Sequence, residues 1–181
     1  MISIRDEIET AVQDADRLTA ALNDRQLAWQ PAPGSWSIAQ NLEHLTITAQ
    51  RMMEAMDAGC AKGSREGPGS KPWQPSIFAR WFLRILEPPA KMKVKTPAAF
   101  DPAPGRPLHT LMPEFRSTHR ALTEKLAEYA QYDQNRTRVV SPFQSAIRYK
   151  LGTALAIIPA HLRRHLDQMR QIRNHAGFPA S

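Results

Sequence analysis

The chain of 181 residues has very little cysteine and no long apolar run. Its single cysteine, Cys60, cannot form an intramolecular disulfide, which favours a reducing compartment. No stretch of about 18 apolar residues is present to span a bilayer. The N-terminal sequence is charged from Arg5 onward and lacks the apolar core of a signal peptide. These absences predict a soluble cytoplasmic protein.

Several motifs of well-defined enzyme classes are also missing. Leu162 follows His161, so there is no H-E-x-x-H motif of a zincin protease. No histidine is preceded by the Glu-x-x-His spacing, which removes the di-iron carboxylate bundles. The chain contains neither a G-x-S-x-G nucleophile motif nor a G-x-x-x-x-G-K-[ST] phosphate loop.

What the chain does contain is a pattern of four long amphipathic helices. Hydrophobic residues make up 42% of the sequence, and its length suits a single domain over residues 1–181. Apolar positions recur at helical spacing in four segments, at about residues 3–24, 37–59, 108–130 and 153–174. Ser37 and Gln40 form an S-x-x-Q capping box ahead of the second helix, and Thr153 is expected to cap the fourth. The segment 135–152 between the third and fourth helices is predicted to be a loop. We therefore predict an all-α four-helix bundle.

A long crossover, residues 60–107, connects the second and third helices and is rich in glycine and proline. Its apolar segment 76–86, SIFARWFLRIL, is expected to be a short helix packed over one end of the core, with a membrane-surface helix as the alternative. Between residues 62 and 95, eight lysines and arginines face two glutamates, a surplus of 8 − 2 = +6 out of a net charge of +7. Because no motif for binding RNA or DNA accompanies this charge, we interpret the segment as a solvated loop. A nucleic-acid or membrane-surface binder acting through residues 62–95 is the alternative.

Three of the six histidines are candidates for chemistry. His161 and His165 are spaced i, i+4 on the fourth helix, so their rings lie one above the other. His44 lies on a flank of the second helix among small residues, where another group can approach. We place His119 among charged neighbours and His175 beyond the end of the fourth helix. From spacing alone, two helix histidines bonded to backbone or water compete with a metal site.

The two histidine segments resemble the signatures of DinB-like proteins, the DinB/YfiT superfamily. SWSIAQNLEHL is similar to W-S-[IV]-x-x-x-x-x-H-[LI], and AHLRRHLDQ is similar to H-x-x-[RH]-H-x-x-Q, with Arg164 and Gln168 in the expected places. The resemblance implies a four-helix bundle with a long crossover between helices two and three. It also implies one divalent metal ion, such as zinc, nickel or iron, bound by His44, His161 and His165. It implies no binding of nucleic acid.

The leading functional hypothesis is a metal-dependent transferase or hydrolase acting on a small-molecule substrate. Some relatives use a low-molecular-weight thiol as cofactor, and Arg80 or Arg84 are candidates to receive such an anionic thiol. Glu43 directly precedes His44 and Asp167 lies two positions after His165, but each helix position turns by about 100°, so both point away from the ligands and neither is assigned as general base. The alternative hypothesis is a non-catalytic, stress-related metal-binding protein that works as a homodimer.

Overall fold

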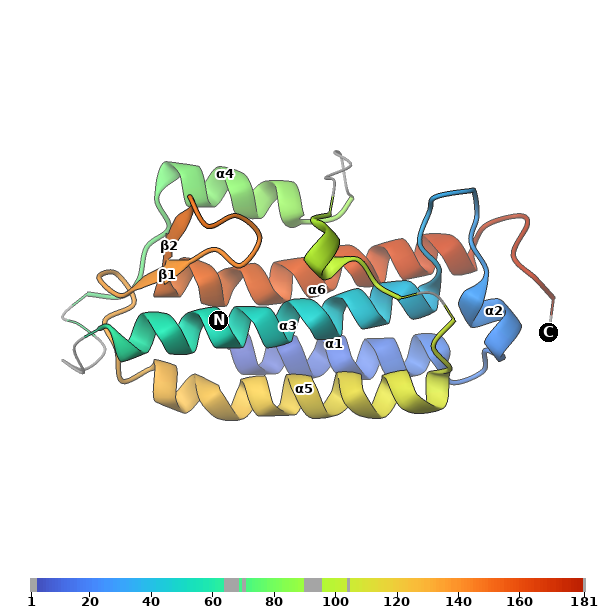
Figure 1. Cartoon of the computed structure of the whole chain (residues 1–181), viewed down its shortest axis with the longest axis horizontal. Coiled ribbons are helices and arrows are strands. Elements are labelled where there is room, and N and C mark those ends of the chain that lie inside the picture. Colours follow the sequence, from blue (N-terminus) through green and yellow to red (C-terminus); the bar gives the residue numbers. More distant parts are fainter. Residues whose placement is uncertain (1–2, 64–68, 70, 90–95, 104, 181) are drawn as a thin grey trace.

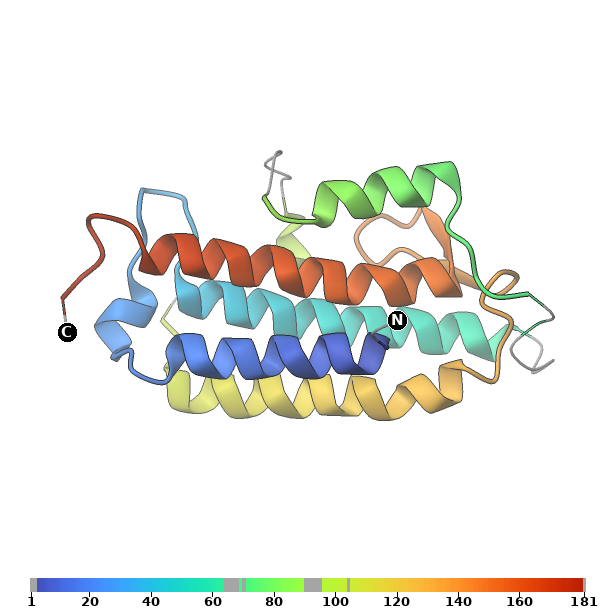
Figure 2. The ribbon, with the colours of Figure 1, turned by 180° about the vertical axis from the view of Figure 1, so that it is seen from behind.

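Four long helices lie side by side in the computed structural model, which describes residues 3–63, 69, 71–89, 96–103 and 105–180 (Figures 1 and 2). They are α1 (Ile4–Thr19), α3 (Ile38–Ala61), α5 (Leu108–Tyr129) and α6 (Leu151–Arg173). Each helix buries its apolar face in one shared core, where the largest fully buried side chains include Phe115, Leu42 and Tyr129. The predicted all-α four-helix bundle is confirmed, and α3 and α5 begin and end within two residues of the predicted positions.

The first helix is shorter than predicted, because α1 ends at Thr19 and not near residue 24. A separate short helix, α2 (Asp24–Ala28), follows it. Asn23 caps α2, since its Oδ1 accepts a hydrogen bond from the Gln26 N–H while Gln26 Oε1 accepts one from the Asn23 N–H, both at 3.0 Å. The apolar spacing continues as far as Leu22, so periodicity alone does not reveal the break.

The segment predicted as a loop before α6 contains a small antiparallel hairpin of β1 (Arg138–Val140) and β2 (Arg148–Lys150). Val139 pairs with Tyr149, and both side chains are buried. The predicted cap at Thr153 is wrong, because α6 begins at Leu151 directly after β2. Backbone carbonyls satisfy its first N–H groups: Leu151 donates to Thr137 O at 3.0 Å, and Gly152 donates to Gln134 O at 3.1 Å.

The crossover has structure of its own, as predicted, with α4 (Ile77–Leu86) and a 3₁₀ turn, η1 (Ala98–Phe100). The predicted short helix is thus confirmed; α4 packs along α6, burying Ala79 and Leu86 (Figure 1). Four of the basic residues predicted to form the charged segment lie outside the described residues, namely Arg65, Lys91, Lys93 and Lys95. Within the described ranges, no helix combines the length and the apolar content that crossing a membrane requires.

Candidate metal centre

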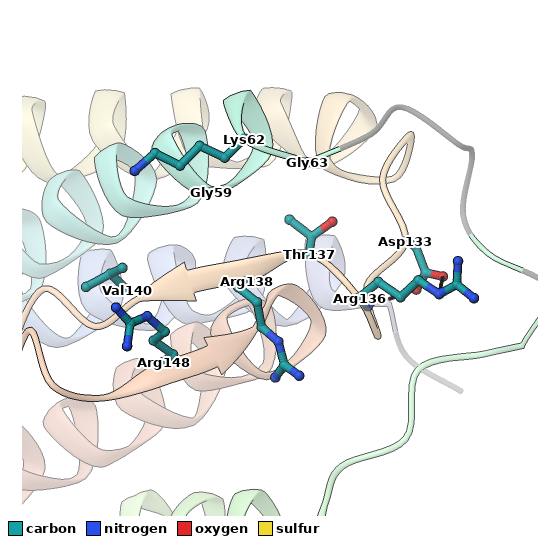
Figure 3. Close-up of a pocket in the computed structure, with 9 residues that line it drawn as sticks. All are labelled: Gly59, Lys62, Gly63, Asp133, Arg136, Thr137, Arg138, Val140 and Arg148. Carbon is teal, nitrogen blue, oxygen red and sulfur yellow. Dashed lines mark hydrogen bonds and ion pairs between the residues drawn. The ribbon is translucent and has the colours of Figure 1, made fainter.

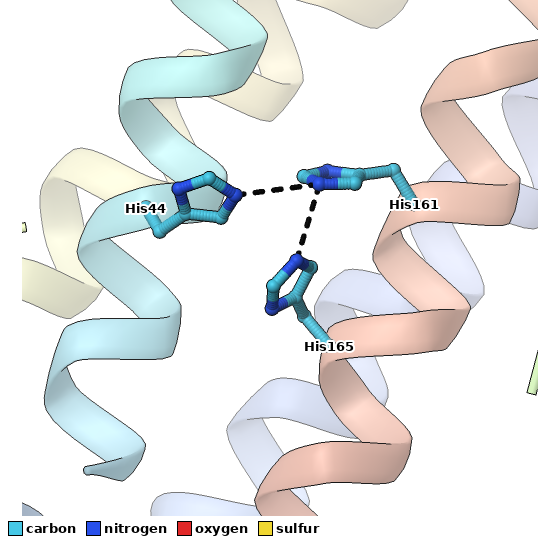
Figure 4. Close-up of side chains that lie close together, drawn as sticks. All are labelled: His44, His161 and His165. Atoms are coloured by element: carbon cyan, nitrogen blue, oxygen red, sulfur yellow. Dashed lines mark hydrogen bonds between the residues drawn. The ribbon is translucent and has the colours of Figure 1, made fainter. Parts of the chain in front are cut away.

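The structure brings together the three histidines that the sequence singled out. His44 projects from α3, and His161 and His165 project from α6, which packs against α3 (Figure 4). All three side chains are buried, none with more than 9% of its surface exposed. Figure 4 shows the imidazole rings pointing toward one another across the gap between the two helices.

The three Nε2 atoms converge on one point. His161 Nε2 lies 3.3 Å from His44 Nε2 and 3.1 Å from His165 Nε2, and three ring nitrogens, one from each histidine, lie within 4.8 Å of one another. A tetrahedral zinc ion with Zn–N bonds of about 2.0–2.1 Å separates its ligand nitrogens by about 3.3 Å. The spacing is therefore that of ligands around a single ion, and these histidines could bind one.

Two neighbours fix the tautomers of the outer rings. His44 Nδ1 lies 2.9 Å from the carbonyl oxygen of Phe100, which can only accept, so the Nδ1–H donates. His165 Nδ1 lies 2.8 Å from Asn41 Oδ1 and donates to it in the same way. The amide of Asn41 is oriented by its own Nδ2, which donates to Ser37 O at 2.8 Å. Both outer rings therefore present an unprotonated Nε2 toward His161.

This arrangement leaves the cluster short of a proton donor. The Nε2 of neutral His161 carries at most one hydrogen, while the Nε2 lone pairs of His44 and His165 both face it. One of these two buried acceptors stays unsatisfied while the three rings are neutral, which is costly in a site shielded from water. A cation at the centre would satisfy all three nitrogens at once.

Burial also holds the three rings in the neutral form that binds metals. Desolvation is the main cause of the lowered pKa of His44, and hydrogen bonding to Phe100 O partly offsets it. The pKa values of His161 and His165 lie well below the ordinary range, first through desolvation and then through their positively chargeable neighbours, which include Arg164. Metal binding at neutral pH therefore needs little or no proton release from these imidazoles.

Aromatic side chains enclose the cluster. The Trp36 indole lies over His44 and His165, with ring centroids 4.6 and 5.9 Å apart, and Phe143 lies 6.5 Å from His161. Sequence reasoning did not predict these aromatic contacts, although Trp36 belongs to the W-S segment. Nor did it predict Asn41 as the acceptor for His165, although Asn41 precedes His44 by one helical turn. The Phe100 carbonyl carries no signal in the sequence, because any residue has one.

The other candidates lie elsewhere. The charged surroundings predicted for His119 are wrong: its ring is buried, donates through Nδ1 to Phe115 O at 2.8 Å, and has a pKa lowered by burial to about 4. Glu43 is buried but is ion-paired with Arg106, 3.3 Å from Oε1. Arg80 and Arg84 are exposed on α4, and no described contact joins them to the three histidines.

A separate cavity of about 410 Å³ lies between the C-terminal end of α3 and the β1–β2 hairpin (Figure 3). Four basic side chains and one acidic side chain are among its lining residues, which are Gly59, Lys62, Gly63, Asp133, Arg136, Thr137, Arg138, Val140 and Arg148. Gly59 follows His44 by 59 − 44 = 15 positions on α3, which is about 22 Å along a helix. The cavity is therefore not part of the histidine cluster.

Comparison with known proteins identifies the family. Searches of the curated proteins and of the solved structures found no match. A family model described as the DinB superfamily matches residues 7–169. The match includes both histidine segments, all of α3 and α5, and most of α1 and α6. Because it extends over most of the sequence, the chain belongs to the DinB superfamily.

Proposed function

We propose that His44, His161 and His165 bind one divalent metal ion through their Nε2 atoms. The observation that carries this proposal is the convergence of three buried nitrogens, in which His161 Nε2 lies 3.3 and 3.1 Å from the other two and those two are fixed as acceptors. The spacing suits a tetrahedral ion such as zinc, and imidazole ligands also suit nickel, copper or iron.

We further propose that the protein is a metal-dependent enzyme, a transferase or hydrolase that acts on a small molecule. Three neutral imidazoles leave a fourth position open, as in catalytic metal sites. A divalent ion there would act as a Lewis acid and favour deprotonation of a thiol or water molecule at that position. A low-molecular-weight thiol is the proposed cofactor, supported by the resemblance of the two histidine segments to DinB-like proteins.

The chain's own residues supply the orientation that this chemistry needs. Asn41 and the Phe100 carbonyl hold two of the rings from behind, so their Nε2 atoms stay directed at the centre. Trp36 covers two of the three rings and limits the access of water from its side. Electrostatic interactions are stronger in such a site than in bulk water.

Metal content tests the site directly. We expect elemental analysis of the purified protein to find about one divalent ion per chain. His161→Ala should lose the ion, whereas His109→Ala, which removes an exposed histidine at the start of α5, should retain it. Equal metal in wild type and His161→Ala would overturn the proposed site.

Activity is tested by screening low-molecular-weight thiols and water as nucleophiles against a panel of electrophilic substrates. Turnover should require the metal and should disappear in His165→Ala. A stoichiometric ion with no turnover across the panel would favour the non-catalytic metal-binding alternative.

A further inference from the structure

The outward face of α4 is unusually apolar for a protein surface. Within the described part of the chain, the large hydrophobic side chains that are exposed are Ile77 at 81%, Phe78 at 60%, Trp81 at 56% and Val140 at 41%. Three of these four lie within two turns of one helix, so they form a patch and are not scattered. Contiguous exposed apolar patches on proteins mark surfaces that bind something.

The patch is presented on a helix that is firmly held. Ala79 and Leu86 face the bundle, while Ile77, Phe78 and Trp81 face away from it. Phe78 and Trp81 contact each other, with ring centroids 5.7 Å apart. The C-terminal end of α4 is fixed to α6, because Arg163 Nε donates to Glu87 Oε2 and Arg164 Nη1 donates to the Ile85 carbonyl, both at 2.9 Å. The exposed face therefore needs no ordering before it docks.

Positive charge flanks the apolar patch. Arg80 and Arg84 are exposed, one turn apart, on the same side of α4, and the helix contains no acidic residue. Neither guanidinium has an ion-pair partner in the described part of the chain. The whole chain carries a net charge of +7. An anionic surface complements this face.

We propose that the outward face of α4 docks onto the surface of a bilayer that contains anionic lipids. The helix lies in the plane of the interface, with Phe78 and Trp81 at the boundary between headgroups and acyl chains and with Arg80 and Arg84 at the lipid phosphates. Aromatic side chains on one face and arginines beside them are the composition of interfacial helices.

A second copy of the chain fits this face less well. A symmetric contact between two α4 helices would bring four arginines close together with no carboxylate on the helix to pair them. The patch is also small, since stable protein interfaces use about 20–30 residues on each side.

Flotation with vesicles tests the docking surface. We expect the wild-type protein to bind vesicles of phosphatidylcholine mixed with phosphatidylglycerol far better than vesicles of phosphatidylcholine alone. Arg80→Gln with Arg84→Gln should lower the partition coefficient about thirtyfold, at about 1 kcal/mol for each charge. Phe78→Ser with Trp81→Ser should lower it about a hundredfold or more.

The matched control is Arg138→Gln with Arg148→Gln, which removes two positive charges from the hairpin. Both arginines are exposed and line the cavity between α3 and the hairpin. This variant should bind the vesicles almost as well as wild type. The proposal is overturned if both α4 variants bind the anionic vesicles as well as wild type does, or if the hairpin variant loses as much vesicle binding as the α4 variants. Lipid-free sedimentation in which wild type self-associates and the α4 variants do not would overturn it too, because α4 would then contact a second copy. Because these residues lie outside the histidine cluster, metal content should be unchanged in all three variants.

Discussion

The side-chain oxygen of Asn41 lies 2.8 Å from Nδ1 of His165 and is the acceptor that turns this ring toward its partners. Asn41 is itself buried and tied to the Ser37 carbonyl at the first turn of α3. The same turn that caps the helix thus orients a histidine on a different helix. Ser37, Asn41 and His165 form one chain of hydrogen bonds behind the cluster.

Asn41→Leu should weaken metal binding without removing a ligand. The His165 ring then loses the acceptor that fixes its tautomer, and such losses cost about 10–100-fold in metal affinity. Asn41→Asp keeps an acceptor at the position and should retain the affinity of wild type or exceed it. The dissociation constants can be measured by competition with a chromophoric chelator.

Thr48→Val serves as the control for Asn41→Leu, because Thr48 is a buried polar residue of the same helix whose hydroxyl has no hydrogen-bond partner among the described residues. Its affinity for metal should match wild type. The same affinity in Asn41→Leu would show that this hydrogen bond does not position the ligand.

Removing the metal should lower the thermal stability of the protein. An ion that binds only the folded state, at a concentration about 100 times its dissociation constant, adds about 2.7 kcal/mol to the free energy of unfolding. For a chain of this size, that corresponds to a rise in Tm of about 5–10 °C. Differential scanning calorimetry with and without a chelator measures the shift, which His161→Ala should abolish. A chelator effect of equal size in that variant would place the ion elsewhere.

Much of the fold and the three ligands could be predicted from the sequence because they depend on local patterns. The capping box at Ser37 and the apolar stripe of α3 specify where that helix begins, and the i, i+4 spacing puts His161 and His165 on one face. The segments around them resemble DinB-like signatures, which supplied His44 as the third residue. The structure brings these three together from two helices.

What the sequence did not reveal depends on contacts between distant segments. The α6 N-terminus is capped by the Thr137 and Gln134 carbonyls, so no side-chain signal marks it. His44 is oriented by a backbone carbonyl 56 residues away, at Phe100. The sequence neighbours of His119 are mostly polar residues, yet its ring faces the core. These features follow from packing, which periodicity within one helix does not encode.

His119 should make the protein sensitive to acid. Its pKa is lowered by burial from 6.5 to about 4 in the folded state, so between these values the unfolded chain binds a proton that the folded chain does not. The free energy of unfolding therefore falls as pH falls from 6.5 to 4, by about 3 kcal/mol for this residue. Below the folded pKa both states are protonated, and the contribution stays constant.

Urea denaturation at several pH values measures this effect in wild type and in His119→Leu. The variant should show a slope of stability against pH that is smaller by about 1.4 kcal/mol per pH unit within this window. The three cluster histidines are present in both proteins, so their own contributions cancel in the difference, apart from the charge–charge coupling between His119 and His161. Parallel pH profiles would contradict the assignment of a buried neutral imidazole.

Arg106 should be needed to keep the buried Glu43 carboxylate in the core. The Glu43 side chain is 7% exposed, and its Oε1 accepts from Arg106 Nη1 at 3.3 Å, while its Oε2 has no hydrogen-bond partner in the part of the chain that the structure describes. Breaking a buried ion pair by removing one partner costs about 3–5 kcal/mol. Because the Arg106 side chain is 35% exposed and solvent screens the pair, we expect Arg106→Met to lower the free energy of unfolding by about 2 kcal/mol.

Two further variants separate this cause from a general loss of packing. Glu114→Gln removes only the more exposed ion pair of Arg106, in which Nη2 lies 2.7 Å from Glu114 Oε2. This change should lower the free energy of unfolding by less than about 1 kcal/mol. Glu43→Gln added to Arg106→Met removes the uncompensated charge and should recover most of the lost stability, as measured by urea unfolding. If the double variant is no more stable than Arg106→Met, the stem of the arginine contributes through its packing and not through its charge.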